Sequence, residues 1–119
     1  MEIGVRPQIY IAVLDTPPQR VISSILHGLE EEGIPFFLEE FSDREVVELA
    51  YQASVKSSLN VGISCNQTQA ILHYKNLKNT TPYIVLENIQ QQPKEVLKRF
   101  GGNAARLVKG VAFKDLEDN

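Results

Sequence analysis

Only four residues, NQTQ at 66–69, separate two short apolar runs near the middle of the chain, VGISC at 61–65 and AILHY at 70–74. Both runs have the length and composition of buried strands. Two parallel strands need a crossover of about a dozen residues, whereas an antiparallel hairpin can be closed by as few as about two. These two runs are therefore predicted to pair as an antiparallel hairpin.

Three further apolar runs predict strands on either side of this hairpin. IYIAVL at 9–14 and FFLEEF at 36–41 precede it, and YIVLE at 83–87 follows it. The first two strand pairs along the chain need crossovers, because a helix-length segment separates the members of each pair. The sheet is therefore expected to be mixed.

Two of the crossovers have helical patterns. Thr16 is expected to cap a first helix that ends at Gly33, with its apolar residues on one stripe, and Ser42 is expected to cap a second helix over 43–58. The order β-α-β-α-β-β-β-α then predicts an α/β fold of three layers, in which helices cover both faces of a five-stranded sheet.

The last helix is expected to open with PKEVLKRF at 93–100. The glycines of FGGN should interrupt it, and Asn103 should cap a second part, AARLVKG at 104–110. Glycines that lead into a helix could also suggest a phosphate site, but a helix cap explains them more simply. The charged tail KDLEDN is expected to fray.

Composition limits the class of protein. A chain of 119 residues with 43% hydrophobic residues suits one domain, 1–119, with a core at about 8–112. A net charge of −3 and the lack of a basic cluster argue against a nucleic-acid partner. No apolar run approaches the roughly 20 residues that span a bilayer, so we expect a soluble, cytoplasmic protein without a membrane partner.

The candidates for catalysis are few. The sequence has no Walker loop, GxSxG, HExxH or paired CxxC motif. His73 and Cys65 are interpreted as packed structural residues, and the single cysteine excludes an internal disulfide. A small-molecule enzyme could use the crevice beyond the strand ends, near Asp15 or Asn66, but it would lack a pair of catalytic groups.

Three successive glutamates in GLEEEGIPF, at 28–36, stand at the expected C-terminal end of the first helix. The macrodipole already makes that end negative, so a compensating partner is expected. A helical projection points Glu31 outward, on a polar face that it shares with Arg20, Ser23, Ser24 and His27. Two interpretations stay open: a solvated face with a His27–Glu31 contact, or a docking surface where a cation or a basic group of another chain meets Glu31.

Three stretches together resemble a known family: GLEEEGIPF, LNVGISCNQTQAILHY and FGGNAARLVKG. Over about residues 8–112 the chain resembles the small subunit of the reactivating factor for adenosylcobalamin-dependent diol and glycerol dehydratases, which is related to the medium subunit of the dehydratase itself. The resemblance implies a fold similar to the anticodon-binding-domain type, with five strands of which one is antiparallel.

The resemblance also implies a function. The chain would be a non-catalytic subunit that pairs with a large, chaperone-like ATPase subunit, commonly as two large and two small chains. Their complex would dock transiently on the dehydratase and release damaged cobalamin by subunit exchange. Whether diol or glycerol dehydratase is served, and whether a bacterial microcompartment holds the complex, stays open. The alternative is a component of the dehydratase that contacts cobalamin.

The resemblance implies a role for one carboxylate in particular. A glutamate that matches Glu31 would ligate a divalent ion, Mg²⁺ or Ca²⁺, at the contact with the large subunit. One carboxylate cannot fill the oxygen shell of such an ion, so most ligands would come from water and the partner. We expect the isolated chain to bind no cofactor. The predicted interface comprises Arg20, Ser23, Ser24, His27 and Glu31.

Overall fold

The computed structural model describes the backbone of residues 7–117 and the side chains of residues 7–110. Its elements follow the predicted order. They are β1 (Ile9–Leu14), α1 (Gln19–Glu31), β2 (Phe36–Phe41), α2 (Val46–Lys56), β3 (Val61–Cys65), β4 (Gln69–Tyr74), β5 (Ile84–Glu87), a short 3₁₀ turn η1 (Ile89–Gln91) and α3 (Lys94–Glu117).

The five strands form one mixed sheet in the order β2-β1-β3-β4-β5. β1 is parallel to both β2 and β3, while β4 is antiparallel to β3 and to β5. β4 is thus the one strand that runs against the others, as predicted. Asn66 closes the hairpin, because its Oδ1 accepts hydrogen bonds from the backbone N–H groups of Thr68 and Gln69.

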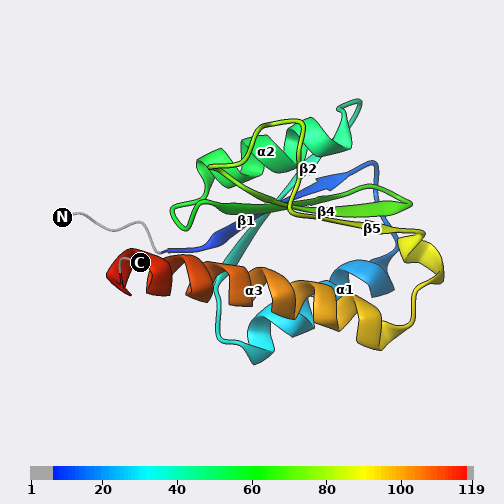
Figure 1. Cartoon of the computed structure of the whole chain (residues 1–119). Helices are drawn as coiled ribbons and strands as arrows, with labels where there is room; N and C mark the ends of the chain where they lie inside the picture. The colour runs from blue at the N-terminus through cyan, green and yellow to red at the C-terminus, as the bar shows by residue number, and fades with distance from the viewer. Residues whose placement is uncertain (1–6, 118–119) are drawn as a thin grey trace.

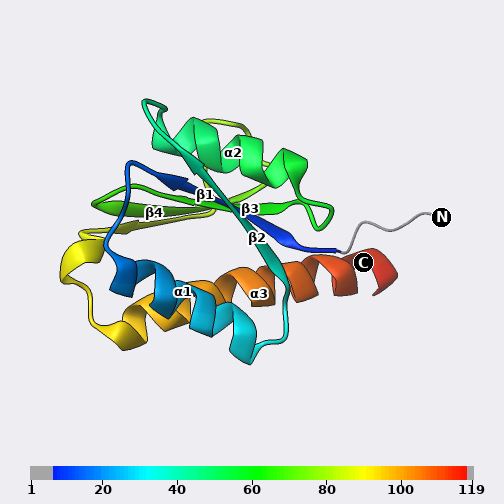
Figure 2. The ribbon, with the colours of Figure 1, turned by 180° about the vertical axis from the view of Figure 1, so that it is seen from behind.

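Helices cover both faces of the sheet, which confirms the predicted three layers. α1 and α3 lie side by side on one face, and α2 covers the other (Figures 1 and 2). The larger core lies between the sheet and the helices α1 and α3, and includes Ile11, Ile25 and Leu97. The smaller core lies under α2, where Leu49 packs with Leu14.

The expected break in the last helix is wrong, because α3 runs without interruption through the two glycines at 101 and 102. A Cβ atom on Gly101 would lie 2.1 Å from the carbonyl oxygen of Ile25 in α1, and one on Gly28 would lie 2.1 Å from the carbonyl oxygen of Lys98. These glycines let the two helix backbones touch, since no side chain would fit between them. Asn103 therefore lies inside α3 and caps nothing.

Smaller differences concern element ends. The N-cap of α1 is Pro18 rather than Thr16, and it makes no side-chain capping bond. The N-cap of α2 is Glu45 rather than Ser42, and its carboxylate accepts from two backbone N–H groups at 2.9 Å. Instead of fraying from the start of KDLEDN, the tail is helical through residue 117; residues 118 and 119 lie outside the described part.

The adjacent glycines of α3 provide a matched test of this contact. Gly101→Ala should destabilise the fold by about 2 kcal/mol or more, because the new methyl group collides with the α1 backbone. Gly102→Ala meets nothing within 4 Å and should stabilise the helix by about 0.5–1 kcal/mol. Urea unfolding followed by circular dichroism measures both changes. Equal stabilities of the two variants would contradict the close backbone contact.

Candidate functional site

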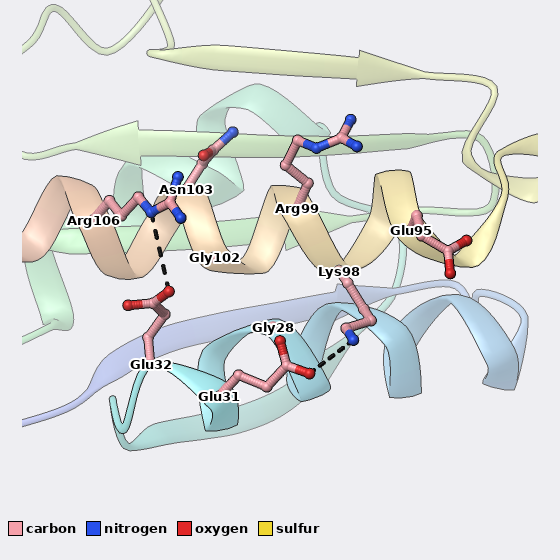
Figure 3. Close-up of a pocket in the computed structure, with 9 residues that line it drawn as sticks. All are labelled: Gly28, Glu31, Glu32, Glu95, Lys98, Arg99, Gly102, Asn103 and Arg106. Carbon is pink, nitrogen blue, oxygen red and sulfur yellow. Dashed lines mark ion pairs between the residues drawn. The ribbon is translucent and has the colours of Figure 1, made fainter.

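The candidate site is centred on the glutamates that end α1. Glu30 and Glu31 are exposed, and Glu32 is half-buried. Nζ of Lys98, on α3, lies 2.7 Å from Oε2 of Glu31, and Figure 3 shows this pair bridging the two helices. The compensating group that the helix dipole requires is thus a cation of the same chain, one that sequence reasoning missed.

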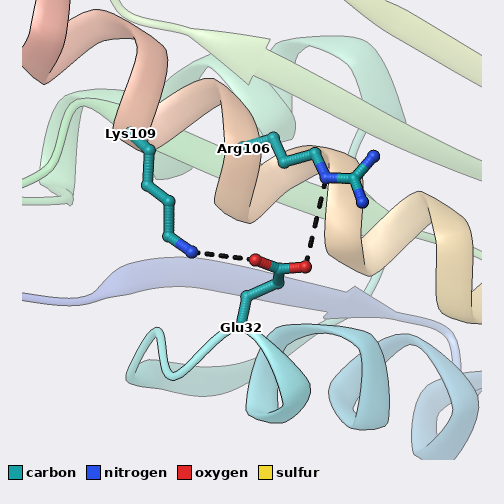
Figure 4. Close-up of polar contacts among 3 residues, drawn as sticks. All are labelled: Glu32, Arg106 and Lys109. Carbon is teal, nitrogen blue, oxygen red and sulfur yellow. Dashed lines mark hydrogen bonds and ion pairs between the residues drawn. The ribbon is translucent and has the colours of Figure 1, made fainter.

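Two cationic side chains of α3 lie beside the carboxylate of Glu32. Nζ of Lys109 donates to Oε1 of Glu32 at 2.8 Å, and Nε of Arg106 lies 4.0 Å from its Oε2 (Figure 4). The Glu32 side chain is 27% exposed, whereas that of Glu31 is 61% exposed and has one cation beside it. Of these two paired carboxylates, Glu31 is therefore the one that another molecule can reach with less rearrangement.

The ion pairs shift the pKa values of their members. A hydrogen bond with Glu31, together with its charge, raises the pKa of Lys98. The hydrogen bond from Lys109, together with its charge, lowers the pKa of Glu32 from its ordinary value of 4.5. Both shifts favour the charged forms, so the helix end carries fixed charges at neutral pH.

A shallow cleft of about 210 Å³ lies over the contact of α1 with α3 (Figure 3). Its walls combine three carboxylates with three cationic side chains. They are Glu31, Glu32, Glu95, Lys98, Arg99 and Arg106, with Asn103 and two glycines between them. The chemistry of this cleft is suited to polar and charged groups of a partner.

The predicted docking residues of α1 fall in different surroundings. His27 is exposed one turn before Glu31, and Ser23 is half-buried one turn earlier. Arg20 is exposed, but its Nη2 donates to the carbonyl oxygens of Gln90 and Gln92 at 2.8 and 3.0 Å, which ties the start of α1 to the segment before α3. Their contact with another chain stays a prediction.

The expectation that Ser24 faces outward is wrong. Its side chain is 6% exposed, and its Oγ donates to the carbonyl oxygen of Arg20 at 2.8 Å. Ser24 lies one turn before Gly28, on the side of α1 that α3 covers. A serine whose hydroxyl donates to a carbonyl oxygen of its own helix can face a neighbouring helix. The projection of one helix does not account for that neighbour.

The cations that complete the site lie 67 to 77 residues away from the glutamates they contact. Sequence reasoning missed Lys98, Arg106 and Lys109, because only the tertiary contact of α1 with α3 brings them near. The one available signal was the spacing of basic residues along the last helix, and it does not by itself name a partner.

His73 is a structural residue, as predicted from its place in a buried strand. It is fully buried, its Nδ1 accepts from the N–H of Tyr74 at 3.0 Å, and its Nε2 lies 3.2 Å from the carbonyl oxygen of Asn79. The N–H contact at Nδ1 fits the tautomer that carries its proton on Nε2, from which it can donate to the Asn79 carbonyl. The ring also packs edge-on against Tyr51.

The other candidate catalytic residues do not form a site. Cys65 is buried in β3, and loss of hydration raises the pKa of its thiol to about 12, so a reactive thiolate is disfavoured. The Asn66 side chain is used in the hairpin turn, and Gln67 donates to the backbone carbonyl of Asp15, not to its carboxylate. No nucleophile or acid–base pair meets in this crevice among the described side chains.

The donor groups present at the site limit how a metal ion could bind. Within residues 7–110, no three His, Cys, Asp or Glu side chains gather in a way that could hold a metal ion. Glu31 offers a hard carboxylate oxygen, which suits Mg²⁺ or Ca²⁺ as one ligand among several.

None of the described helices is both long enough and apolar enough to cross a membrane.

The fold and the site define a small three-layer α/β protein whose exposed helix end carries a carboxylate next to a charged cleft. The chain belongs to the dehydratase medium subunit family, whose model matches residues 6–114. It is 44% identical over 110 residues to the diol dehydratase-reactivating factor small subunit of Klebsiella michiganensis, a match that covers 92% of this chain and 86% of that protein.

Other similar proteins are also dehydratase-reactivating factors. The propanediol dehydratase-reactivating factor small subunit of Salmonella typhimurium is 44% identical over 92 residues, covering 77% of this chain and 78% of that protein. A solved diol dehydratase-reactivating factor, complexed with ADP and Mg²⁺, matches with a TM-score of 0.83 at 42% identity over 89% of this chain and 95% of that one. The resemblance to reactivating-factor small subunits is confirmed.

A more distant structure supports the fold alone. A glycerol dehydratase reactivase matches with a TM-score of 0.77 at 24% identity, over 87% of this chain and 93% of that one. The mixed sheet with one antiparallel strand is thus shared beyond the nearer relatives.

The two glutamate pairs predict a specific pH response. Because the pKa of Glu32 is lowered in the folded chain, its pair contributes stability above about pH 4.5, and this contribution is lost as the pH falls through the lowered pKa. Lys109→Met should return the Glu32 pKa toward 4.5, whereas Lys98→Met should leave it lowered. A carbon-detected NMR titration of the glutamate carboxylates measures both. An unchanged Glu32 pKa in Lys109→Met would contradict the assigned cause.

Proposed function

We propose that this chain is the non-catalytic small subunit of a reactivating factor for an adenosylcobalamin-dependent diol or glycerol dehydratase. The observation that carries this proposal is the 44% identity to a curated small subunit over 92% of the chain. The name of that relative implies a larger companion, and the large subunit would supply the ATPase activity. Two large and two small chains would assemble.

In this proposal, damaged cobalamin leaves the dehydratase by subunit exchange. The chain would be displaced from the large subunit, and the dehydratase's own medium subunit would take its place. Membership of the dehydratase medium subunit family supports this step, because two chains that compete for one site need similar docking surfaces. We expect the complex in the cytoplasm, with a microcompartment location left open.

Glu31 is proposed as the central docking residue, flanked by Ser23 and His27. Its carboxylate is exposed, lies at a helix end, and would exchange its partner Lys98 on docking. A divalent cation at the interface would receive one oxygen from Glu31 and the rest from water and the large subunit. The Mg²⁺ in the related reactivating-factor structure supports a cation in such a complex. Such an ion would bridge the Glu31 carboxylate and the oxygen ligands of the large subunit.

Neutralising Glu31 tests this role directly. Glu31→Gln should weaken the affinity for the large subunit about tenfold or more, because a neutral amide oxygen binds a divalent cation more weakly than a charged carboxylate does. The matched control is Glu30→Gln, which removes the same charge from the neighbouring exposed position and should leave the affinity nearly unchanged. Biolayer interferometry with the immobilised large subunit, with and without a chelator, measures both.

The fold should survive these changes, since both positions are exposed. Urea midpoints that match the unmodified chain would establish this. If Glu31→Gln binds as tightly as Glu30→Gln in the presence of divalent cation, Glu31 has no docking role.

A second candidate function is a component of the dehydratase itself that contacts cobalamin. The family description favours it, since the matching model is that of the dehydratase medium subunit. Titration of the chain with cobalamin, followed by visible absorbance, separates the two functions. We expect no saturable spectral change with the isolated chain. Tight stoichiometric binding would favour the second function.

A further inference from the structure

The exposed side of α3 beside Glu31 carries a row of side chains that donate hydrogen bonds. The proposed docking role of Glu31 does not use them. Arg99, Asn103 and Arg106 are spaced four and three residues apart, so they follow one another along one face of the helix. All three line the charged cleft, and in Figure 3 Arg99 and Asn103 extend from α3 on the side away from α1. We call these three residues the arginine stripe.

The guanidinium groups of the arginine stripe form fewer and longer ion pairs than the lysines nearby. Lys98 and Lys109 each lie within 2.8 Å of a glutamate oxygen. Arg106 is 71% exposed and approaches Glu32 only to 4.0 Å, at a carboxylate that already accepts from Lys109. Arg99 is exposed and forms no ion pair with any side chain that the structure describes. Two guanidinium groups are thus available for another molecule.

We propose that the arginine stripe is a second docking element, adjacent to Glu31, that binds carboxylates on the surface of the large subunit. This inference rests on the proposed function and names the chemistry of the surface that the partner presents. Guanidinium groups bind carboxylates through two parallel hydrogen bonds, and Asn103 between them can donate a third.

The charges around the stripe favour separate carboxylates over a polyanion. Glu31, Glu32 and Glu95 line the same cleft, and the chain as a whole has a net charge of −3. A nucleic-acid backbone would be repelled by these carboxylates. A cation on Glu31 would need several more oxygen ligands, and carboxylates of the partner are the usual source. The stripe and the proposed cation therefore call for the same acidic surface.

Charge reversal tests the stripe in the complex of this chain with the large subunit. The double variant R99E/R106E should raise the Kd at least about tenfold, and its Kd should depend less steeply on salt than that of the unmodified chain. The matched control, K75E/K78E, makes the same change in net charge on the connection between β4 and β5, which lies on the opposite side of the sheet (Figure 1). Its Kd should change less than about threefold.

A milder pair of variants keeps the test independent of folding. R99Q/R106Q removes both charges, whereas R99K/R106K keeps the charges but cannot form the bidentate hydrogen bonds. Both variants should weaken binding, and the lysine variant should weaken it less. Urea unfolding should give nearly the same midpoint for all, since both positions are exposed and Glu32 keeps its hydrogen bond from Lys109 when Arg106 is changed.

The outcomes separate this inference from the proposed function. If the unmodified chain does not bind the large subunit, the proposed function fails. If it binds, but R99E/R106E binds equally well or is weakened no more than K75E/K78E, the stripe is not a docking element. Saturable binding of a fluorescent single-stranded oligonucleotide, abolished in R99E/R106E, would assign the stripe to nucleic acid and also overturn the inference.

Discussion

The contact between the backbones of α1 and α3 positions everything else at the candidate site. Gly28 and Gly101 leave no room for a Cβ atom, so the helices meet without intervening side chains. This closeness brings the cations of α3 to the glutamates that end α1, and it fixes which carboxylate is held and which is exposed. A wider separation would leave three like charges at an unfavourable helix end without compensation.

The site combines a fixed and an exchangeable part. Glu32, bonded to Lys109 and approached by Arg106, closes the end of α1 onto α3. Glu31, an exposed carboxylate that pairs with Lys98, can change partners without disturbing the core. The proposed subunit exchange would need such weak, solvent-exposed contacts, because buried and fully paired charges would make release slow.

Much of this fold follows from local sequence patterns, whereas the site depends on distant contacts. The four-residue NQTQ connection predicts the antiparallel strand, and the apolar runs predict all five strands. Gly101 and Gly102 were misread as a break, because a glycine required by a neighbouring helix looks the same in sequence as one that ends a helix. The sequence also predicts an outward-facing Ser24 and does not identify Lys98 as the partner of Glu31. The reason is the same, since the packing of α3 against α1 determines the surroundings of both residues.

In the proposed complex, the end of α1 and the adjoining side of α3 face the large subunit. Carbodiimide labelling of carboxylates, followed by mass spectrometry, measures this in the intact complex. Glu31 and Glu95, which line the cleft, should lose most of their labelling on assembly, while Glu45 and Glu87, outside the cleft, should keep theirs. Undiminished labelling of Glu31 in a verified complex, with protection elsewhere, would contradict the account.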